Sequence, residues 1–365
     1  MIYNNLIAFS KKNINKKNLI FFLPNFKIGG AGNSILKICK NIDYKNYNIF
    51  IISLGKNNFK NQFKKYNANI LELPEKRLFY SINSIKKIVQ IISKDRKTIF
   101  ISNINYSNVI ACMFLAKIKN VKIITIERTP VQELDFYSSL NELIKKKIIK
   151  YLIKKSYKFA YLRIGNSKQV SKDLSELCGC KVKTYLPYIN ITKSKISLFS
   201  KPNIYITWIG RNSPEKNLDD FINVTKLLKR KNIIFSVVTD KPTKTRARNI
   251  KYYKFKNTNL DRIYKKTDIL ISTSFYEGFP NVVAEGINYY CLIISSKNFG
   301  GSTQLIGNSN GLIYEIKNPN DLANKITYSI NNPYKMKKII IKSKKNLILL
   351  SKKYNQFYKR LFFKI

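Results

Sequence analysis

Apolar residues in the first half of the chain gather in short runs that alternate with stretches of helical spacing. The runs are rich in Ile, Phe and Val, and polar residues bound each of them. They predict strands at 18–24, 47–54, 98–102, 121–126 and 159–165, with helices at 34–41 and 81–93. Strands that alternate with helices along a chain are typical of a parallel, doubly wound sheet.

The second half repeats this alternation after a polar stretch. Residues 188–202 are rich in Lys and Ser without a clear period, so we interpret them as a linker. The pattern beyond them predicts strands at 203–209, 232–239, 268–273 and 292–295, helices at 217–229, 259–265 and 281–290, and an amphipathic helix at 351–363. We therefore expect an α/β protein with two doubly wound, Rossmann-like domains at 1–187 and 203–345, followed by a C-terminal segment at 346–365.

Residues 140–159 have apolar positions at roughly helical spacing with seven lysines among them. A helix of this composition suits the surface of a membrane. It also suits a core helix with a solvated basic edge. Because the lysines do not segregate to one side, the pattern favours the core helix slightly.

Length and composition are those of a globular protein. The 365 residues suffice for two domains, and 44% of them are hydrophobic. No apolar run reaches the roughly 18 residues that a membrane span needs. Residues 1–18 lack the apolar stretch of a signal peptide, so we expect a cytoplasmic protein.

The net charge of +48 suggests an anionic partner. Of the 68 basic residues 58 are lysines, and they are spread along the whole chain together with abundant Asn, Ile, Tyr and Phe. Dedicated nucleic-acid binders more often cluster their charge and use arginine. We therefore expect no nucleic-acid function, but peripheral contact with an anionic membrane at its cytoplasmic face.

The five cysteines predict reduced thiols. Their number is odd, and Cys178 and Cys180 are one residue too close for the usual metal or redox pair. The chain has no histidine to complete a metal site. We expect neither a metal nor a cofactor.

The segment FYEGFPNVVAEG at 275–286 is the strongest candidate for chemistry. It places Glu277 and Glu285 on either side of a Gly-Phe-Pro-Asn turn between a predicted strand and a predicted helix. Glu277 is expected in the loop, Glu285 on the helix, and Pro280 in the first helical turn. Free backbone N–H groups and a helix N-terminus at this point would favour a phosphate.

A second candidate follows the strand at 203–209. Arg211 comes directly after Gly210 in the next loop, and Lys216 follows five residues later. Fixed cations of this kind stabilise the charge that grows on a leaving diphosphate. Asp219 and Asp220 are expected in the first turn of the next helix, where carboxylates favour the helix dipole, and we interpret them as structural.

Together these segments resemble the retaining GT-B glycosyltransferases, family 4 in particular. The paired glutamates match its signature, and IGRNSPEK at 209–216 is similar to its donor segment. Further similarities are GGAG at 29–32, RIGNS at 163–167, and the glycines at 300, 301 and 311. The likeness is strongest from about residue 204 to 330. It implies a GT-B architecture, with two domains facing across a cleft and the last helix crossing back onto the first domain.

The resemblance also implies roles for individual residues. Arg211, Lys216 and Glu277 would be catalytic, the two cations on the diphosphate and Glu277 on the donor sugar. Glu285 would bind the ribose hydroxyls. The remaining donor contacts would come from Gly210, Gly278, Phe279, Pro280 (through its carbonyl only) and Asn281, and the acceptor side of the cleft from Gly29, Gly30 and Arg128.

The chain departs from the family at two positions. Arg128 stands where many relatives carry a histidine, which rules out an imidazole base there. A retaining transferase tolerates this, because the departing phosphate can accept the proton of the acceptor. Gln304 stands where a glutamate is usual, and it would alter the preference for the donor sugar.

We therefore expect a hexosyl- or N-acetylhexosaminyltransferase that uses a nucleotide sugar, UDP-linked in our interpretation. The acceptor would be a glycan or a lipid-linked glycan of the bacterial cell envelope. Three alternatives stay open. They are a sugar-nucleotide epimerase of the same fold, a non-catalytic basic binding protein, and a decayed transferase.

Overall fold

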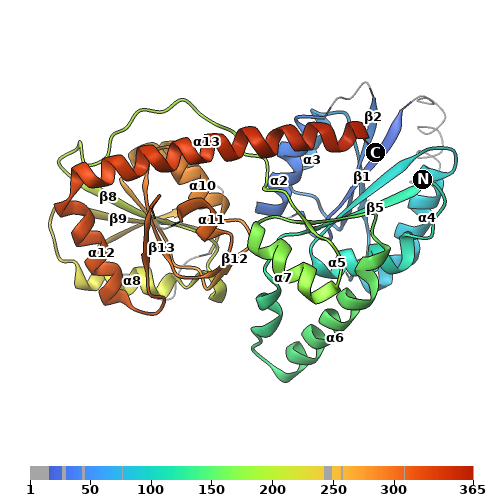
Figure 1. Cartoon of the computed structure of the whole chain (residues 1–365), viewed down its shortest axis with the longest axis horizontal. Coiled ribbons are helices and arrows are strands. Elements are labelled where there is room, and N and C mark those ends of the chain that lie inside the picture. Colours follow the sequence, from blue (N-terminus) through green and yellow to red (C-terminus); the bar gives the residue numbers. More distant parts are fainter. Residues whose placement is uncertain are drawn as a thin grey trace. The chain divides into compact units, whose positions relative to one another are not determined.

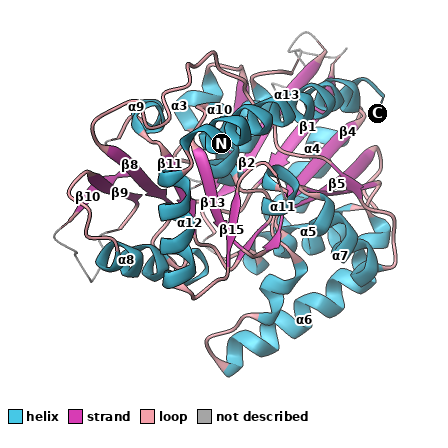
Figure 2. Ribbon diagram, turned by 60° about the vertical axis from the view of Figure 1, so that its left-hand side comes forward, coloured by secondary structure: helices cyan, strands magenta, loops and turns pink. Residues whose placement is uncertain are grey.

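The chain divides into two units, each with its own parallel sheet. One unit comprises Met1–Tyr188 with Tyr354–Ile365, and the other comprises Ile189–Lys353. The computed structural model describes residues 16–26, 30–42, 46–75, 77–241, 249–255, 258–307 and 309–364. Figure 1 shows the order of the elements along the chain, and Figure 2 distinguishes helices from strands.

The first unit is built on a seven-stranded sheet of order β3-β2-β1-β4-β5-β6-β7, in which every neighbouring pair is parallel. Its strands are β1 Lys17–Phe22, β2 Tyr47–Leu54, β3 Ala68–Leu73, β4 Thr98–Asn103, β5 Val121–Glu127, β6 Leu162–Gly165 and β7 Lys183–Thr184. Its helices are α2 Gly30–Cys39, α3 Lys60–Lys64, α4 Ile82–Ser93, α5 Asn105–Ile110, α6 Leu140–Ser156 and α7 Lys168–Cys178, with short η1 Phe79–Ser81, η2 Ala111–Leu115, η3 Val131–Asp135 and η4 Tyr157–Phe159.

Alternate residues of each strand serve opposite faces of this sheet. Ile20 and Phe22 of β1 pack with α4 and α6 in one buried cluster. Leu19 and Phe21 pack with α2 and α3 in the other. Because helices cover both faces, the central strands β1, β2 and β4 are almost wholly buried and mostly apolar, as is usual in parallel sheets.

The second unit repeats the plan with a six-stranded sheet of order β10-β9-β8-β11-β13-β15 and a separate two-stranded ladder of β12 and β14. Its strands are β8 Ile204–Ile209, β9 Ile233–Thr239, β10 Ile250–Lys254, β11 Ile269–Ser272, β12 Tyr276–Glu277, β13 Leu292–Ser296, β14 Phe299–Gly300 and β15 Leu312–Tyr314. Its helices are α8 Leu218–Leu227, α9 Leu260–Lys266, α10 Asn281–Asn288, α11 Ser302–Ile306, α12 Pro319–Asn331 and most of α13 Pro333–Lys364, with η5 Pro214–Lys216.

The core of the second unit lies mainly between its sheet and α8, α12 and α13. Trp208, Phe221 and Phe235 are fully or almost fully buried there. On the opposite face α10 approaches the sheet closely at Gly286. A Cβ on this glycine would lie 2.4 Å from a methyl carbon of Leu270, so the sequence needs glycine at this crossing.

The two parallel, Rossmann-like α/β units confirm the predicted fold class. Several details differ from the prediction. The predicted C-terminal helix at 351–363 is only the end of α13, which begins at Pro333. The edge strand β3 was not predicted at all, because its sequence ANILEL interleaves apolar and polar residues and half of it is incompletely buried.

The segment predicted as a linker runs along the second unit. Thr192 N donates to Asn288 Oδ1 over 3.1 Å, and Phe199 N donates to Asp268 Oδ1 over 2.9 Å. Its use as a linker between domains at 1–187 and 203–345 stays a prediction. No helix in the described part of the chain is long and apolar enough to cross a bilayer.

Candidate active site

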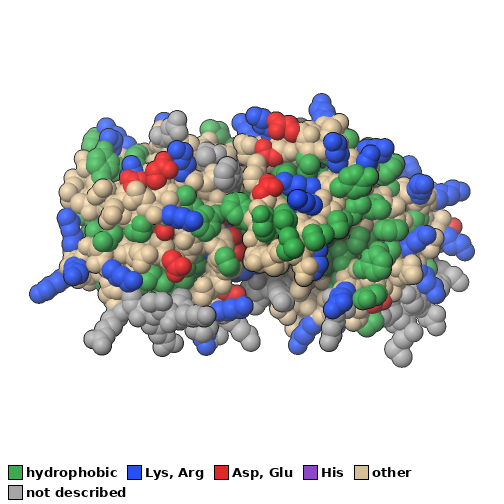
Figure 3. Space-filling model, turned by 90° about the horizontal axis from the view of Figure 1, so that it is seen from below, with side chains coloured by type: hydrophobic (Ala, Val, Ile, Leu, Met, Phe, Trp, Pro, Cys, Tyr) green, Lys and Arg blue, Asp and Glu red, His purple; other side chains and the backbone are tan. Residues whose placement is uncertain are grey.

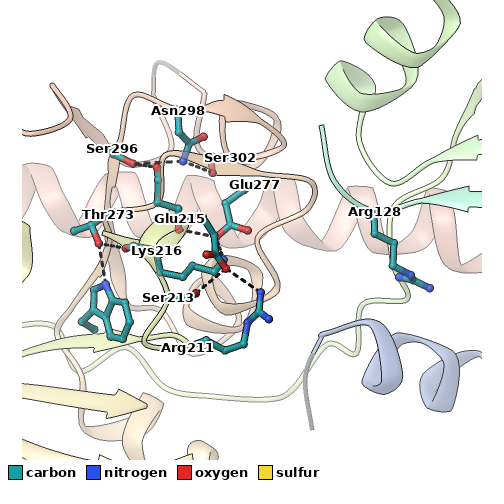
Figure 4. A network of polar contacts seen from close by, with 12 residues as sticks. Arg128, Arg211, Ser213, Glu215, Lys216, Thr273, Glu277, Ser296, Asn298 and Ser302 are labelled. Carbon is teal, nitrogen blue, oxygen red and sulfur yellow. Dashed lines mark hydrogen bonds and ion pairs between the residues drawn. The ribbon is translucent and has the colours of Figure 1, made fainter. Parts of the chain in front are cut away.

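Four of the predicted donor and catalytic residues lie in the segments that follow two neighbouring strands of the second sheet. Gly210, Arg211 and Lys216 follow β8, while Glu277 follows β11, and β8 and β11 are adjacent and parallel. Ligands of open α/β sheets bind outside the carboxyl ends of the strands, so this is the edge where a site is expected. Figure 4 shows the side chains of Arg211, Lys216 and Glu277 at this edge.

A short chain of hydrogen bonds ties the two loops together. The buried indole of Trp208 donates from Nε1 to Thr273 Oγ1 over 2.9 Å. The hydroxyl of Thr273 donates in turn to the carbonyl oxygen of Lys216 over 2.7 Å. Gly210 makes room for this indole, since a Cβ there would lie 2.8 Å from the ring. The backbone of Lys216 is therefore fixed relative to the end of β11.

Lys216 and Glu277 form an ion pair across the two loops. Lys216 Nζ lies 2.5 Å from Glu277 Oε1, and the two side chains are only 21% and 15% exposed. Ser274 Oγ donates to the same carboxylate oxygen over 2.8 Å. Charge-assisted hydrogen bonds in a partly dry setting hold both groups in defined positions.

Glu277 lies in the short strand β12, which corrects the prediction that it lies in a loop. Glu277 pairs with Gly300 of the parallel strand β14, and Gly301 N donates to the carbonyl oxygen of Glu277 over 2.9 Å. Gly300 has φ +115°, and a Cβ there would lie 1.6 Å from that carbonyl oxygen. This pairing could not be read from the amino-acid pattern, because two-residue strands have no periodicity.

Arg211 is held apart from the Lys216–Glu277 pair by a different carboxylate. Its Nη2 lies 3.0 Å from Glu215 Oε1, and its side chain is 61% exposed. Ser213 Oγ donates to the same oxygen over 2.6 Å. The prediction had overlooked Glu215, although its spacing of four residues from Arg211 suits such a pair. Arg211 thus stands at the solvent side of the loop, oriented by its neighbour.

Glu285 projects from α10 and accepts a hydrogen bond from Tyr264 of α9, with Tyr264 OH 2.9 Å from Glu285 Oε2. Tyr264 is buried and stacks on Tyr289, with ring centroids 5.5 Å apart. Burial, and then the charge of Glu285, raise the pKa of Tyr264 well above its usual value, so its hydroxyl stays a donor. Tyr264 is a positioning residue that the sequence pattern did not reveal.

The turn between the glutamates is mostly buried. Gly278, Phe279 and Pro280 are buried, and Asn281 begins α10. Pro280 precedes the helix as its N-cap residue, one position before the predicted first turn. Its carbonyl oxygen accepts from Ala284 N over 3.1 Å, which makes it the first acceptor of the helix.

Two further predictions concern residues near this edge. Asp220 is buried and accepts from Tyr314 OH and Lys317 N, over 3.0 and 2.9 Å, which agrees with a structural role. Asp219 is exposed. Gln304 lies in α11, which begins just after Gly300 of β14 and Gly301.

Among the described residues, His, Cys, Asp and Glu side chains form no cluster that could hold a metal ion.

The remaining predicted residues belong to the first unit. Gly30 begins α2 after β1, whereas Gly29 lies outside the described residues. Arg128 directly follows β5, and its Nε and Nη2 both donate to Asn103 Oδ1 at the end of β4, over 3.1 and 2.7 Å. The guanidinium is therefore oriented at the carboxyl edge of this sheet.

Two residues near Arg128 have unusual features that the sequence pattern did not predict. Ile104 has φ +78° and ψ +141°, a strained conformation for a β-branched residue. Glu127 is almost fully buried and accepts from Tyr157 OH over 2.9 Å and from Arg128 N over 3.2 Å. Burial raises the pKa of Glu127 to about 7.

Comparison with known proteins supports the likeness seen in the motifs. Residues 190–346 match the family described as glycosyl transferases group 1. No curated protein sequence matches the chain significantly.

Several solved structures share the architecture of the whole chain. Anabaena HepE, solved with UDP and glucose, is 15% identical with a TM-score of 0.75, and the match covers 94% of this chain and 100% of that one. A glycosyltransferase from Rickettsia africae is 20% identical with a TM-score of 0.71, covering 95% and 99%. A mutant of S. aureus TarM, solved with Fondaparinux, alpha-GlcNAc-glycerol and UDP, is 14% identical with a TM-score of 0.70, covering 94% and 99%. These likenesses establish the two-domain fold.

Proposed function

We propose that this chain, a glycosyltransferase of GT-B fold with a group 1 domain at 190–346, transfers a hexosyl or N-acetylhexosaminyl unit from a UDP-sugar to a glycan or lipid-linked glycan. The observation that carries the proposal is the ion pair of Lys216 and Glu277 at the carboxyl ends of neighbouring strands. One partner is a cation suited to a diphosphate, and the other is a carboxylate suited to sugar hydroxyls.

The cations would supply the main stabilisation of the transition state. As the bond between the sugar carbon and the β-phosphate oxygen breaks, negative charge grows on that phosphate. Lys216, fixed by its ion pair and its backbone hydrogen bond, and Arg211, oriented by Glu215, offer preorganised positive charge there. Fixed cations in this position support a reaction without a metal.

We further propose that the anomeric configuration is retained. The resemblance to family 4 supports this, as does the absence of histidine from the whole sequence. The acceptor oxygen would form its bond on the face from which the phosphate leaves, and the acceptor proton would pass to the phosphate oxygen. No separate protein base is needed, and Arg128 would help to hold the acceptor.

UDP is the donor nucleotide that the comparisons favour, since HepE and TarM were both solved with it. Glu285, held by Tyr264, would accept from the ribose hydroxyls. The acceptor would belong to a cell-envelope glycan, and the enzyme would work at the cytoplasmic face of the membrane. The charge of +48 supports such a location, because anionic lipids attract basic proteins.

Thermal unfolding with added nucleotides tests the donor site. We expect UDP, and neither GDP nor ADP, to raise the melting temperature with the logarithm of its concentration. Glu285→Ala should lose this shift, whereas Glu315→Ala, which changes an exposed glutamate of the same unit, should keep it. A folded protein that no nucleotide stabilises would point to the decayed transferase or the basic binding protein.

The products distinguish the remaining possibilities. A transferase should release UDP in proportion to glycosylated acceptor, and proton NMR of the new linkage should show the donor's anomeric configuration. An epimerase would instead convert the UDP-sugar into an isomer without any acceptor. An inverted linkage would overturn the retaining mechanism while leaving the transferase assignment intact.

A further inference from the structure

Helix α6 of the first unit turns a row of apolar side chains outward. Leu140, Ile144, Ile148 and Tyr151 recur at intervals of four, four and three residues, which places them on one side of the helix. They are 71%, 49%, 52% and 60% exposed. Large apolar side chains gathered on one helix face indicate an interaction surface.

The opposite side of α6 fixes the helix to its unit. Ile149 and Ile153 are buried in the core beneath it. Lys146 Nζ donates to the carbonyl oxygen of Glu133 over 3.1 Å, and Lys150 pairs with Asp135, so α6 is tied to η3. The interpretation of α6 as a core helix is therefore correct for this inner side only. Because the inner side is anchored, the row of apolar side chains on the outer side is held at the surface.

Aromatic side chains extend the row beyond the helix. Phe136 and Tyr137, just before α6, are 42% and 54% exposed, and Tyr106 of α5 is 40% exposed. Helix α5, which carries Tyr106, lies directly against α6. We call the seven residues the α6 surface: Tyr106, Phe136, Tyr137, Leu140, Ile144, Ile148 and Tyr151. Figure 3 looks onto the molecule from the side where α6 lies in Figure 1, and it shows hydrophobic side chains gathered there with basic ones around them.

Lysines accompany the α6 surface. Lys145, Lys147, Lys154 and Lys155 are all exposed on the same helix. The nearby carboxylates of Glu142 and Asp135 pair with Lys146 and Lys150 instead. Among the described residues, no carboxylate forms an ion pair with Lys145, Lys147 or Lys154, so positive charge stands unopposed beside the apolar row.

We propose that the α6 surface docks on an anionic lipid bilayer. The aliphatic side chains would enter the boundary between headgroups and acyl chains, the aromatic ones would lie at the headgroup level, and the lysines would meet lipid phosphates. This inference rests on the proposed function, which places the enzyme at a membrane, and it assigns that contact to a defined surface. Binding of the α6 surface to lipid can be tested without any assay of sugar transfer.

Charge decides between a bilayer and a second copy of this chain. In a two-fold dimer the same patch meets itself, so the lysines of both copies would face each other. A chain with 48 net positive charges makes that approach more costly still. An anionic surface neutralises the same lysines, and it therefore fits the α6 surface where a second copy does not.

Flotation with lipid vesicles tests the docking. The wild type should float with vesicles of phosphatidylcholine that contain phosphatidylglycerol, and far less with phosphatidylcholine alone. Ile144→Ser with Ile148→Ser should weaken the partition at least about tenfold. Lys147→Gln with Lys154→Gln should weaken it about 30-fold, and added salt should reduce wild-type binding.

The matched control lies on α13. Tyr334 and Leu349 are 72% and 66% exposed on that helix, so Tyr334→Ser with Leu349→Ser removes a similar apolar area and should leave flotation unchanged. All variants should keep the melting shift with UDP, which separates a failure of docking from a failure of the donor site. Equal flotation of the Ile144/Ile148 variant and the wild type would overturn the proposal. Light scattering gives the oligomeric state of each protein. A dimeric wild type together with a monomeric Ile144/Ile148 variant would overturn the proposal and show that the α6 surface binds a second copy of the chain.

Discussion

Lys216 Nζ and Glu277 Oε1 lie 2.5 Å apart although 61 positions separate the two residues in the sequence. Each therefore provides the other's charge partner before a substrate binds. A sugar nucleotide would offer both groups new partners, a phosphate for the lysine and a sugar hydroxyl for the carboxylate. The ion pair holds both side chains in defined positions, so little rotamer entropy would be lost when a ligand binds.

Replacing Lys216 by methionine should separate catalysis from folding. Methionine keeps the length of the side chain but removes the charge that faces the leaving diphosphate. We expect kcat/KM for sugar transfer to fall by about 100-fold or more, with a far smaller loss of stability because Ser274 still donates to Glu277. Steady-state assays of UDP release measure the first effect and urea unfolding the second.

Lys226→Met is the matched control, since Lys226 is an exposed lysine of α8 in the same unit. It should retain wild-type kinetics. If Lys216→Met were equally active, the assignment of Lys216 to the diphosphate would be wrong.

Tyr264→Phe should weaken donor binding through Glu285. The change removes the hydroxyl that donates to Glu285 Oε2, while the ring can still stack on Tyr289. A hydrogen bond to a charged group contributes about 1.5–3 kcal/mol, so we expect KM for the donor to rise by about tenfold or more with kcat little changed. Tyr253→Phe, on the partly exposed strand β10, is the control. A change in kcat with constant KM would contradict a positioning role.

The sequence predicted those parts of the molecule that follow from local pattern. The strands before both donor loops were placed within a residue or two of β8 and β11. That these strands are parallel neighbours, which brings Lys216 and Glu277 to one edge of the sheet, came only from the structure. The sequence did not predict which face of α6 is exposed, because apolar residues occur on two sides of the helix. Ile149 and Ile153 are buried, whereas Ile144 and Ile148 are exposed.

The partners that orient the site side chains were missed for a different reason. Tyr264 meets Glu285 across 21 positions, and Asn103 meets Arg128 across 25. Such pairs depend on how helices and strands pack, and no spacing within one element encodes them. The ladder of β12 and β14 was missed for the same reason, since its residues pair only after the two loops have been folded together.

Gly300→Ala should damage the donor site through the backbone. A Cβ at Gly300 would lie 1.6 Å from the carbonyl oxygen of Glu277, so β12 and β14 would have to separate and carry Glu277 away from Lys216. We expect the melting temperature to fall and the shift with UDP to disappear. Gly179→Ala is a suitable comparison, because Gly179 also has positive φ but nothing lies within 4 Å of its added Cβ. Equal melting temperatures and UDP shifts in the two variants would show that the ladder does not hold Glu277.

Glu127 should make the stability of the protein depend on pH. Burial raises its pKa from 4.5 to about 7, with a smaller contribution from the charge of Glu133, while hydrogen bonds from Tyr157 and Asn108 act in the opposite direction. The folded state therefore binds the proton more tightly than the unfolded state. Its contribution to the free energy of unfolding is greatest below pH 4.5, falls as the pH rises to about 7, and stays low above that.

Glu127→Gln should remove this dependence, because the amide remains neutral at every pH. Between about pH 5 and pH 8 the wild type should lose up to about 3 kcal/mol more than the variant in urea unfolding. Glu315→Gln, which changes an exposed glutamate, should follow the wild type, and all other titrating groups cancel in the comparison. Parallel pH profiles for the wild type and Glu127→Gln would mean that Glu127 is ionised at neutral pH despite its burial, with Tyr157 and the Arg128 N–H stabilising the charge.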